Sequence, residues 1–134
     1  MKKEGILNVQ LSKIIASMGH TDKLVICDCG LPIPNGAEVV DLVLVKHIPT
    51  FIDTLRAIMN ELIIEGAVMA TEIETNNHNL FAEIMNILPA VTVKKVSHDQ
   101  FKRMTRDDDI IAFVRTGEAT PFANIILVSG VNFG

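Results

Sequence analysis

The chain has 134 residues, of which 49% are apolar, so it is long enough for one domain with a hydrophobic core. Only 4% are aromatic, Trp and Tyr are absent and the formal net charge is −4, which argues against the stacking platforms and basic stripes of nucleic-acid-binding proteins. No apolar run approaches the ~20 residues of a membrane span, and no basic-then-apolar leader begins the chain. We therefore expect a single domain over residues 1–134, located in the cytoplasm, with neither nucleic acid nor a membrane as its partner.

The first third of the chain predicts a helix, a strand, a loop and a second strand. Apolar residues recur at helical spacing from 7 to 18, and Gly19 is a natural helix stop. The apolar run 24–27, with β-branched residues at its centre, predicts a buried strand. A loop rich in Gly and Pro at 30–36 then separates it from a predicted strand at 39–45.

The middle of the chain predicts a second helix that begins around 47–50, with Pro49 in its first turn. Its apolar stripe continues to Leu62, and we expect Gly66 to end it. A third strand is predicted at 67–73, and a turn follows it.

Beyond that turn, a short helix is predicted at 80–88, ended by Pro89, and a fourth strand at 91–96. Ser97 and Gln100 form a capping-box pattern, which predicts that another helix begins there.

Two further strands are predicted at 110–114 and 124–128, joined by a polar loop rather than a helix. This connection suggests an antiparallel or hairpin-like edge. Elsewhere strands alternate with helices, a rhythm typical of an α/β domain. The predicted fold is a mostly parallel, mixed sheet of about six strands flanked by helices.

Asp28 is the first candidate functional residue because it follows the strand 24–27 directly. In open α/β sheets, the carboxyl ends of strands border the ligand crevice. Alternatively, Asp28 simply caps the turn at 30–32. The spacing alone does not choose between these interpretations.

Two histidines fall in contrasting predicted positions. His20 lies just past the end of the first helix, where the helix dipole favours a protonated ring. His98 lies in the first turn of a predicted helix, where the dipole disfavours the protonated ring. The hypothesis is that His20 acts as an acid and His98 as a neutral acceptor. The alternative is that each ring is a capping or solvated group. His47 and His78 are assigned no role.

The two cysteines, Cys27 and Cys29, are too close in sequence to form a useful disulfide. On a strand, residues two apart face the same side, so we expect free and mostly buried thiols. No Cys-x-x-Cys or His-x-x-x-His spacing supports a metal site, and no glycine-rich phosphate loop is present.

Four blocks of the chain stand out: Gly-His-Thr-Asp at 19–22, Asp-Cys-Gly-Leu-Pro-Ile-Pro at 28–34, Ser97-His98 with Phe101-Lys102, and Arg-Thr-Gly-Glu-Ala-Thr-Pro-Phe-Ala-Asn at 115–124. Together these blocks resemble the ribose pyranase/fucose mutarotase family. The resemblance runs from Met1 to Phe133. It implies a single α/β domain that assembles into rings, typically a homodecamer of two stacked pentamers, with active sites between neighbouring subunits. It also implies a cofactor-independent isomerase that interconverts the pyranose and furanose forms of D-ribose and supplies ribokinase.

The resemblance also implies roles for individual residues. His20 corresponds to the family's proton donor, and Asp28 and His98 correspond to sugar-binding residues. The segment Phe122, Ala123 and Asn124 corresponds to a sugar-contacting loop donated by the adjacent subunit. The family often has Tyr where this chain has Phe122, so a phenolic hydroxyl is missing here.

The expected chemistry moves protons only, so neither a metal nor an organic cofactor is expected. His20 would donate a proton to the ring oxygen, and His98, or a water it holds, would accept the anomeric proton. Asp28 would fix the sugar, with Asn124 closing over it. Three alternatives stay open: an L-fucose or other aldose mutarotase, a non-catalytic sugar-binding protein associated with ribose uptake, and, ranked last, a metal-dependent hydrolase.

Overall fold

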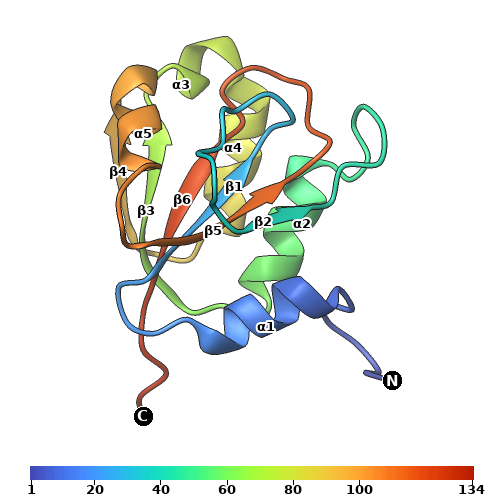
Figure 1. Ribbon diagram of the computed structural model, residues 1–134. Helices are drawn as coiled ribbons and strands as arrows, with labels where there is room; N and C mark the ends of the chain where they lie inside the picture. Colours follow the sequence, from blue (N-terminus) through green and yellow to red (C-terminus); the bar gives the residue numbers. More distant parts are fainter.

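One six-stranded sheet forms the centre of the computed structural model, which describes residues 1–134 (Figure 1). The strands are β1 (Lys23–Cys27), β2 (Val39–Asp41), β3 (Ile64–Ala70), β4 (Thr92–Val96), β5 (Ile110–Arg115) and β6 (Ile125–Ser129). Their order across the sheet is β2-β5-β1-β6-β3-β4. The predicted fold class, a mixed sheet flanked by helices, is confirmed. Assembly into rings stays a prediction.

The last strand does not lie where the sequence suggested. β6 pairs antiparallel with both β1 and β3, whereas every other pair in the sheet is parallel. The predicted antiparallel direction is therefore confirmed, whereas the predicted position at an edge is wrong, because β6 is a central strand. Ile125, Ile126 and Leu127 are all fully buried. Side chains buried on both faces of a strand need a layer of structure above and below the sheet, and a buried backbone needs a paired strand on each side, which only a central strand has.

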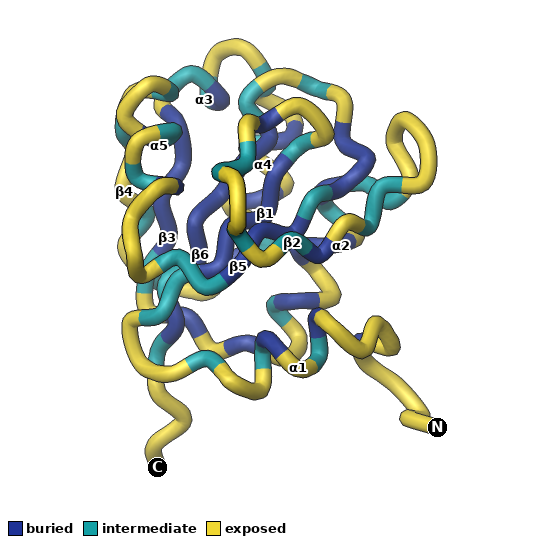
Figure 2. The backbone as a smooth tube through the Cα atoms, in the orientation of Figure 1, coloured by how far each residue is buried: buried dark blue, intermediate teal, exposed yellow.

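Helices cover the two faces of the sheet unequally. They are α1 (Val9–Ser17), α2 (Phe51–Met59), α3 (Ile73–Asn76), α4 (His78–Ile87) and α5 (His98–Met104). Buried residues of α1, α2 and α4 pack in one cluster with Leu24 and Ile26 of β1. On the opposite face, Phe101 of α5 packs with Val25 and Cys27, as expected for alternating side chains of a strand. The central strands are consequently the most buried part of the backbone (Figure 2).

None of these helices has the length and apolar character that crossing a membrane would require.

Two predicted boundaries around α2 are corrected. The helix is capped by Thr50, whose side chain accepts a hydrogen bond from the Asp53 N–H, so Pro49 lies before the helix rather than in its first turn. The helix ends at Met59, and Gly66 lies inside β3. A glycine that resembled a helix stop is therefore a strand residue, because its backbone pairs with Val128 and Thr92.

Two predicted strands are shorter than expected. β2 ends at Asp41 rather than at 45, because Leu44 and Val45 have no partner strand and are exposed. β3 ends at Ala70, opposite the last residue of β4, Val96. Without a strand to pair with, the chain after β3 turns into the short helix α3, where a strand end and a turn were predicted.

Both cysteines are free, as predicted, but they differ in burial, which corrects the prediction that both thiols are mostly buried. Cys27 ends β1 and is fully buried; burial, with the nearby Asp28 charge, raises the pKa of its thiol to about 12. Cys29 lies beyond the strand, in an exposed turn.

We expect iodoacetamide to modify one thiol per native chain, at Cys29, because the thiolate is the reactive form and Cys27 is both buried and protonated. Mass spectrometry after denaturation should find Cys27 still free. The Cys29→Ser variant should not be alkylated until it is unfolded. Rapid alkylation of native Cys29→Ser would contradict the burial of Cys27.

Candidate active site

The direction of β6, opposite to that of the other strands, gathers polar side chains at one end of the strands. The parallel strands β1, β3 and β4 finish at this end of the sheet, which we call the carboxyl edge, and β6 begins there. Asp28 follows β1, His98 comes shortly after β4, and Asn124 precedes β6. Because Ile26 pairs with Ile125 in the antiparallel register, Asn124 falls opposite Cys27 and next to Asp28.

Asp28 and Asn124 hold each other through two hydrogen bonds. The Asn124 Nδ2 donates to Asp28 Oδ2 at 3.2 Å, and the Asp28 backbone N–H donates to Asn124 Oδ1 at 3.0 Å. Asn124 is only 1% exposed, so its amide has little freedom to rotate. The Gly30 N–H also donates to Asp28 Oδ1 at 2.9 Å, so Asp28 caps the turn as well as facing the edge of the sheet.

The Asp28 carboxyl is perturbed by its surroundings. Partial burial raises its pKa, while hydrogen bonds from the Gly30 N–H, the Asn124 amide and the Leu31 N–H, and the proximity of His98, pull the pKa in the opposite direction. Burial disfavours the ionised form of the Asp28 carboxyl, and the aligned donors offset part of that cost. Carboxyl groups with a pKa perturbed in this way are common in functional sites.

His98 is oriented by the start of α5. The Ser97 hydroxyl accepts the Gln100 N–H at 3.1 Å, which confirms the predicted helix start, although the Gln100 side chain bonds Arg103 instead of returning to Ser97. The His98 backbone N–H donates to the two Glu72 carboxylate oxygens, each at 3.0 Å.

The His98 ring meets the Phe122 ring edge-on, with 5.0 Å between ring centroids. Its Nδ1 is buried and has no hydrogen-bond partner in the protein. Buried polar atoms are nearly always paired, so an unpaired imidazole nitrogen here favours a functional role over a purely structural one.

A hollow of about 330 Å³ lies between these groups, a size within the lower range of small-molecule sites. Asp28, His98, Phe122 and Asn124 border it, whereas Ala123 is fully buried in the core beneath. Lys102 also borders the hollow, and sequence reasoning gave it no role. The available signal was its spacing: Lys102 follows His98 by four residues, which places both on one face of a helix.

His20 does not join this group. His20 precedes β1 at the other end of the parallel strands, which we call the amino edge of the sheet. Its Nε2 lies 2.8 Å from Oε2 of Glu65, near the start of β3. The five residues of β1 separate it from Asp28, a length on the order of 16 Å. Sequence spacing gave no indication of the contact with Glu65.

The segment 122–124 contacts Asp28 and His98 of its own chain. This corrects the expectation that an adjacent subunit donates the segment to those residues. The roles of the individual side chains stay predictions.

The loop that carries Phe122 and Asn124 is anchored by a close backbone approach at Gly117. The Gly117 N–H donates to the Pro49 carbonyl at 2.8 Å, and its own carbonyl accepts the His47 N–H. A Cβ atom at this position would lie 2.6 Å from the Ile48 backbone, so only glycine fits.

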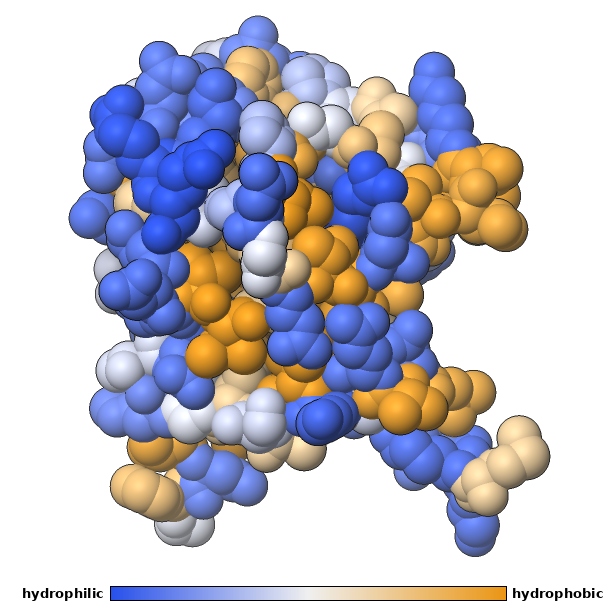
Figure 3. All heavy atoms as spheres, in the orientation of Figure 1, coloured by the Kyte–Doolittle hydropathy of each residue, from blue (hydrophilic) through white to orange (hydrophobic).

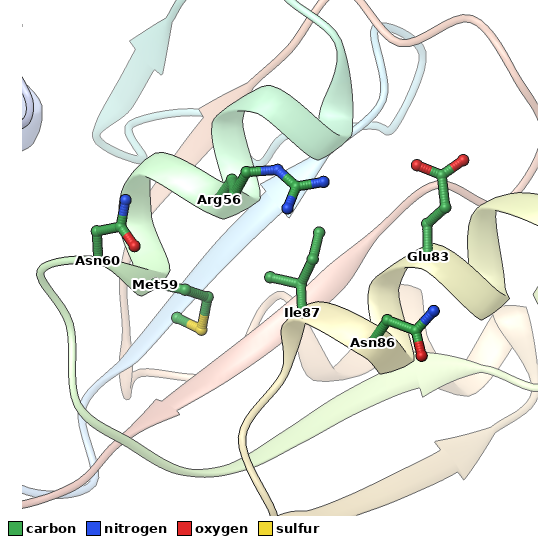
Figure 4. A pocket seen from close by; sticks show the side chains of 6 residues that line it. All are labelled: Arg56, Met59, Asn60, Glu83, Asn86 and Ile87. Atoms are coloured by element: carbon green, nitrogen blue, oxygen red, sulfur yellow. The ribbon is translucent and has the colours of Figure 1, made fainter.

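Other parts of the surface lack this combination of groups. A hollow of about 420 Å³ between α2 and α4 is bordered mainly by exposed polar side chains, including Arg56, Asn60 and Glu83, and contains none of the predicted site residues (Figure 4). No group of three or more His, Cys, Asp or Glu side chains is arranged to hold a metal ion.

Comparison with known proteins gives consistent matches over the full length. A sequence model of the RbsD / FucU transport protein family matches residues 1–132. D-ribose pyranase of Coprothermobacter proteolyticus is 51% identical, covering 99% of this chain and 100% of the relative. D-ribose pyranase of Geobacillus kaustophilus is 53% identical, covering 99% and 96%.

Two solved structures extend the comparison. The structure of Bacillus subtilis RbsD complexed with D-ribose has a TM-score of 0.93 at 44% identity, covering 99% of this chain and 100% of that one. The fucose mutarotase of Streptococcus pneumoniae in complex with L-fucose has a TM-score of 0.79 at 19% identity, covering 99% and 100%, which shows a shared fold.

We expect Gly117→Ala to lower the free energy of unfolding by about 1–3 kcal/mol, because the new methyl group meets backbone rather than a movable side chain. Chemical denaturation measures the change. Gly66→Ala is the matched control: its Cβ would have an ordinary 3.5 Å contact with the Thr92 carbonyl. Equal stability of the two variants would contradict the close approach at Gly117.

We expect Asn124→Ala to raise the pKa of the Asp28 carboxyl further, because the lost Nδ2 donor stabilises the ionised form. It should also destabilise the fold by about 1–3 kcal/mol, since the Asp28 N–H loses its acceptor. Carboxyl ¹³C NMR titration follows the Asp28 pKa, with Asn86→Ala on the exposed surface of α4 as control. A pKa that is unchanged or lowered in Asn124→Ala would refute the contact.

Proposed function

The chain belongs to the RbsD / FucU family, and from this premise we propose that it is an isomerase that interconverts the pyranose and furanose forms of D-ribose. The observation that carries the proposal is the hollow bordered by Asp28, His98 and Asn124, in a chain that shares 44% identity and a TM-score of 0.93 with a ribose-bound protein. In the cytoplasm, the furanose product would supply ribokinase after ribose uptake.

The hollow offers groups suited to a small polyhydroxylated ligand. The Asp28 carboxylate, held at the end of β1, accepts hydrogen bonds from sugar hydroxyls. The buried amide of Asn124 keeps that carboxylate in place, and the Phe122 ring covers the side of the hollow next to His98. With Phe in place of the family's frequent Tyr, position 122 contributes a ring face and backbone groups but no hydroxyl.

Changing the ring size of ribose requires opening and reclosure of the hemiacetal. A proton must reach the ring oxygen while another leaves the anomeric hydroxyl, and closure through a different hydroxyl then gives the other ring. No electrons are transferred, so positioned acids and bases suffice for the chemistry. In the proposed mechanism His98, or a water it holds, accepts the anomeric proton, and His20 supplies the proton to the ring oxygen.

His20 has to come from a neighbouring subunit for this mechanism to work, because within one chain it lies at the far edge of the sheet. The proposal therefore includes a homo-oligomer in which the amino ends of the strands of one subunit meet the carboxyl ends of the strands of another. The family resemblance implies that this assembly is a decamer of two stacked pentamers.

Exposed apolar residues support such an assembly. Leu44 is 76% exposed, Val45 and Ile48 are also exposed on the loop after β2, and Val9 of α1 is 83% exposed. Apolar side chains gather over this loop, at the right of the space-filling view (Figure 3). Apolar side chains gathered on an exposed loop commonly mark a protein–protein contact.

We expect His20→Ala to fold normally and to lose about 10²–10⁴-fold of the catalysed ribose exchange, because it removes the acid that protonates the ring oxygen. Saturation-transfer NMR of ribose measures the exchange. His78→Ala, an exposed histidine at the start of α4, is the matched control. Wild-type exchange in His20→Ala would end the proposed role of His20.

We further expect mixtures of His20→Ala and Asp28→Asn chains to recover activity that neither variant has alone. In a mixed ring, some sites combine an intact His20 of one subunit with an intact Asp28 of the next. Subunits are mixed by partial denaturation and refolding, and ribose exchange is then measured. Recovery supports the shared site, whereas mixed rings without recovery would place both residues in one subunit's site.

A further inference from the structure

Glu118 is a buried carboxylate, 7% exposed, that takes no part in the proposed proton transfers. It lies in the loop between β5 and β6, which also carries Phe122 and Asn124. Building on the proposed function, we infer that Glu118 is a positioning residue: its carboxylate holds this loop so that Phe122 and Asn124 face His98 and Asp28.

The carboxylate of Glu118 joins two separate elements. Its Oε1 accepts the backbone N–H of Phe51, the first residue of α2, at 3.0 Å. A carboxylate is favoured there because the first N–H groups of a helix have no acceptor within the helix and its dipole is positive at this end. Its Oε2 accepts the hydroxyl of Thr120 at 2.8 Å. Both oxygens are therefore used, and the loop is fixed against a rigid helix.

From Thr120 the hydrogen bonds continue to the residue before Phe122. The Asn77 side chain donates through Nδ2 to Thr120 Oγ1 and to the Pro121 carbonyl, each at 2.9 Å. Phe122 itself has φ of 59°, a left-handed conformation that a bulky residue rarely adopts unless its surroundings impose it. The series Glu118–Thr120–Asn77–Pro121 supplies those surroundings.

The backbone of Glu118 reaches the other half of the site. Its carbonyl accepts the Cys29 N–H at 2.9 Å, next to Asp28. Its N–H donates to Thr116 Oγ1 at 3.1 Å, and that hydroxyl donates to the Cys27 carbonyl at 2.8 Å. One residue thus links the turn that holds Asp28 with the turn that holds Phe122.

A role in stability alone gives a different expectation from a role in positioning. If Glu118 only stabilised the loop, its removal would lower the melting temperature and leave the site geometry of the folded protein unchanged. If it positions the loop, the folded variant should bind ribose more weakly and show an altered contact between Phe122 and His98.

The experiment compares Glu118→Ala and Glu118→Gln with Glu83→Ala, an exposed glutamate on α4 that serves as the control. We expect Glu118→Ala to raise the KM for ribose about tenfold, as for the loss of one hydrogen bond to a charged group, with a smaller change in kcat. Glu118→Gln should restore most of the affinity, because its amide can still accept from Phe51 and donate to Thr120 Oγ1. The control should match wild type.

A second readout does not depend on ribose. The edge-on Phe122 ring shifts the NMR signals of the His98 ring, and selectively labelled histidine reports those signals. We expect them to move in Glu118→Ala toward their values in Phe122→Leu. A lower melting temperature with unchanged KM and unchanged His98 signals would overturn the inference.

Two further results separate this inference from its premise. If the wild-type protein does not accelerate ribose exchange, the proposed function fails, and the His98 signals still decide whether Glu118 positions Phe122. If Glu118→Ala does not fold, Thr120→Val breaks the same series of hydrogen bonds while keeping Glu118. It should then show the shifted His98 signals, and unshifted signals in folded Thr120→Val would overturn the inference.

Discussion

The antiparallel insertion of β6 between β1 and β3 is the constraint on which the rest of the site depends. In a fully parallel sheet, the carboxyl edge receives only residues that follow strands. Here one strand begins at that edge, so a residue preceding β6 meets a residue following β1. Because Ile26 pairs with Ile125, the side chain of Asn124 lies close enough to Asp28 for the two hydrogen bonds between these residues.

The same topology explains why two carboxylates, Glu118 and Asp28, lie in and beside the loop from β5 to β6. The loop from β5 to β6 must cross the carboxyl edge, and its backbone and side-chain groups need partners there. Glu118 meets this need from inside, bonded to the start of α2, while Asp28 faces the hollow with its pKa raised by burial. Each carboxylate accepts two hydrogen bonds from backbone or side-chain donors, which offset the cost of removing its oxygens from water.

The distribution of chemical groups over the two edges of the sheet connects the proposed activity to assembly. The carboxyl edge holds an acceptor carboxylate, an imidazole and an amide, and the amino edge holds His20 with Glu65. Within one chain the buried strand β1 separates the two groups by on the order of 16 Å. In our proposal, oligomerisation is therefore part of the catalytic apparatus as well as a source of stability.

The sequence by itself determined the features that depend on neighbouring residues: the buried run of β1, the apolar stripe of α4, the Ser97 cap of α5 and the α/β alternation. It also supplied the family resemblance, which singled out Asp28, His98 and Asn124. Only the tertiary structure decided that Gly66 pairs within a strand, that β6 is central, that Phe122 faces His98 of its own chain and that His20 lies at the far edge. It also revealed the contacts of Glu118 and Glu65. These features depend on backbone pairing and hydrogen bonds between residues distant in sequence, and periodicity within one segment carries no information about which other segment it will meet.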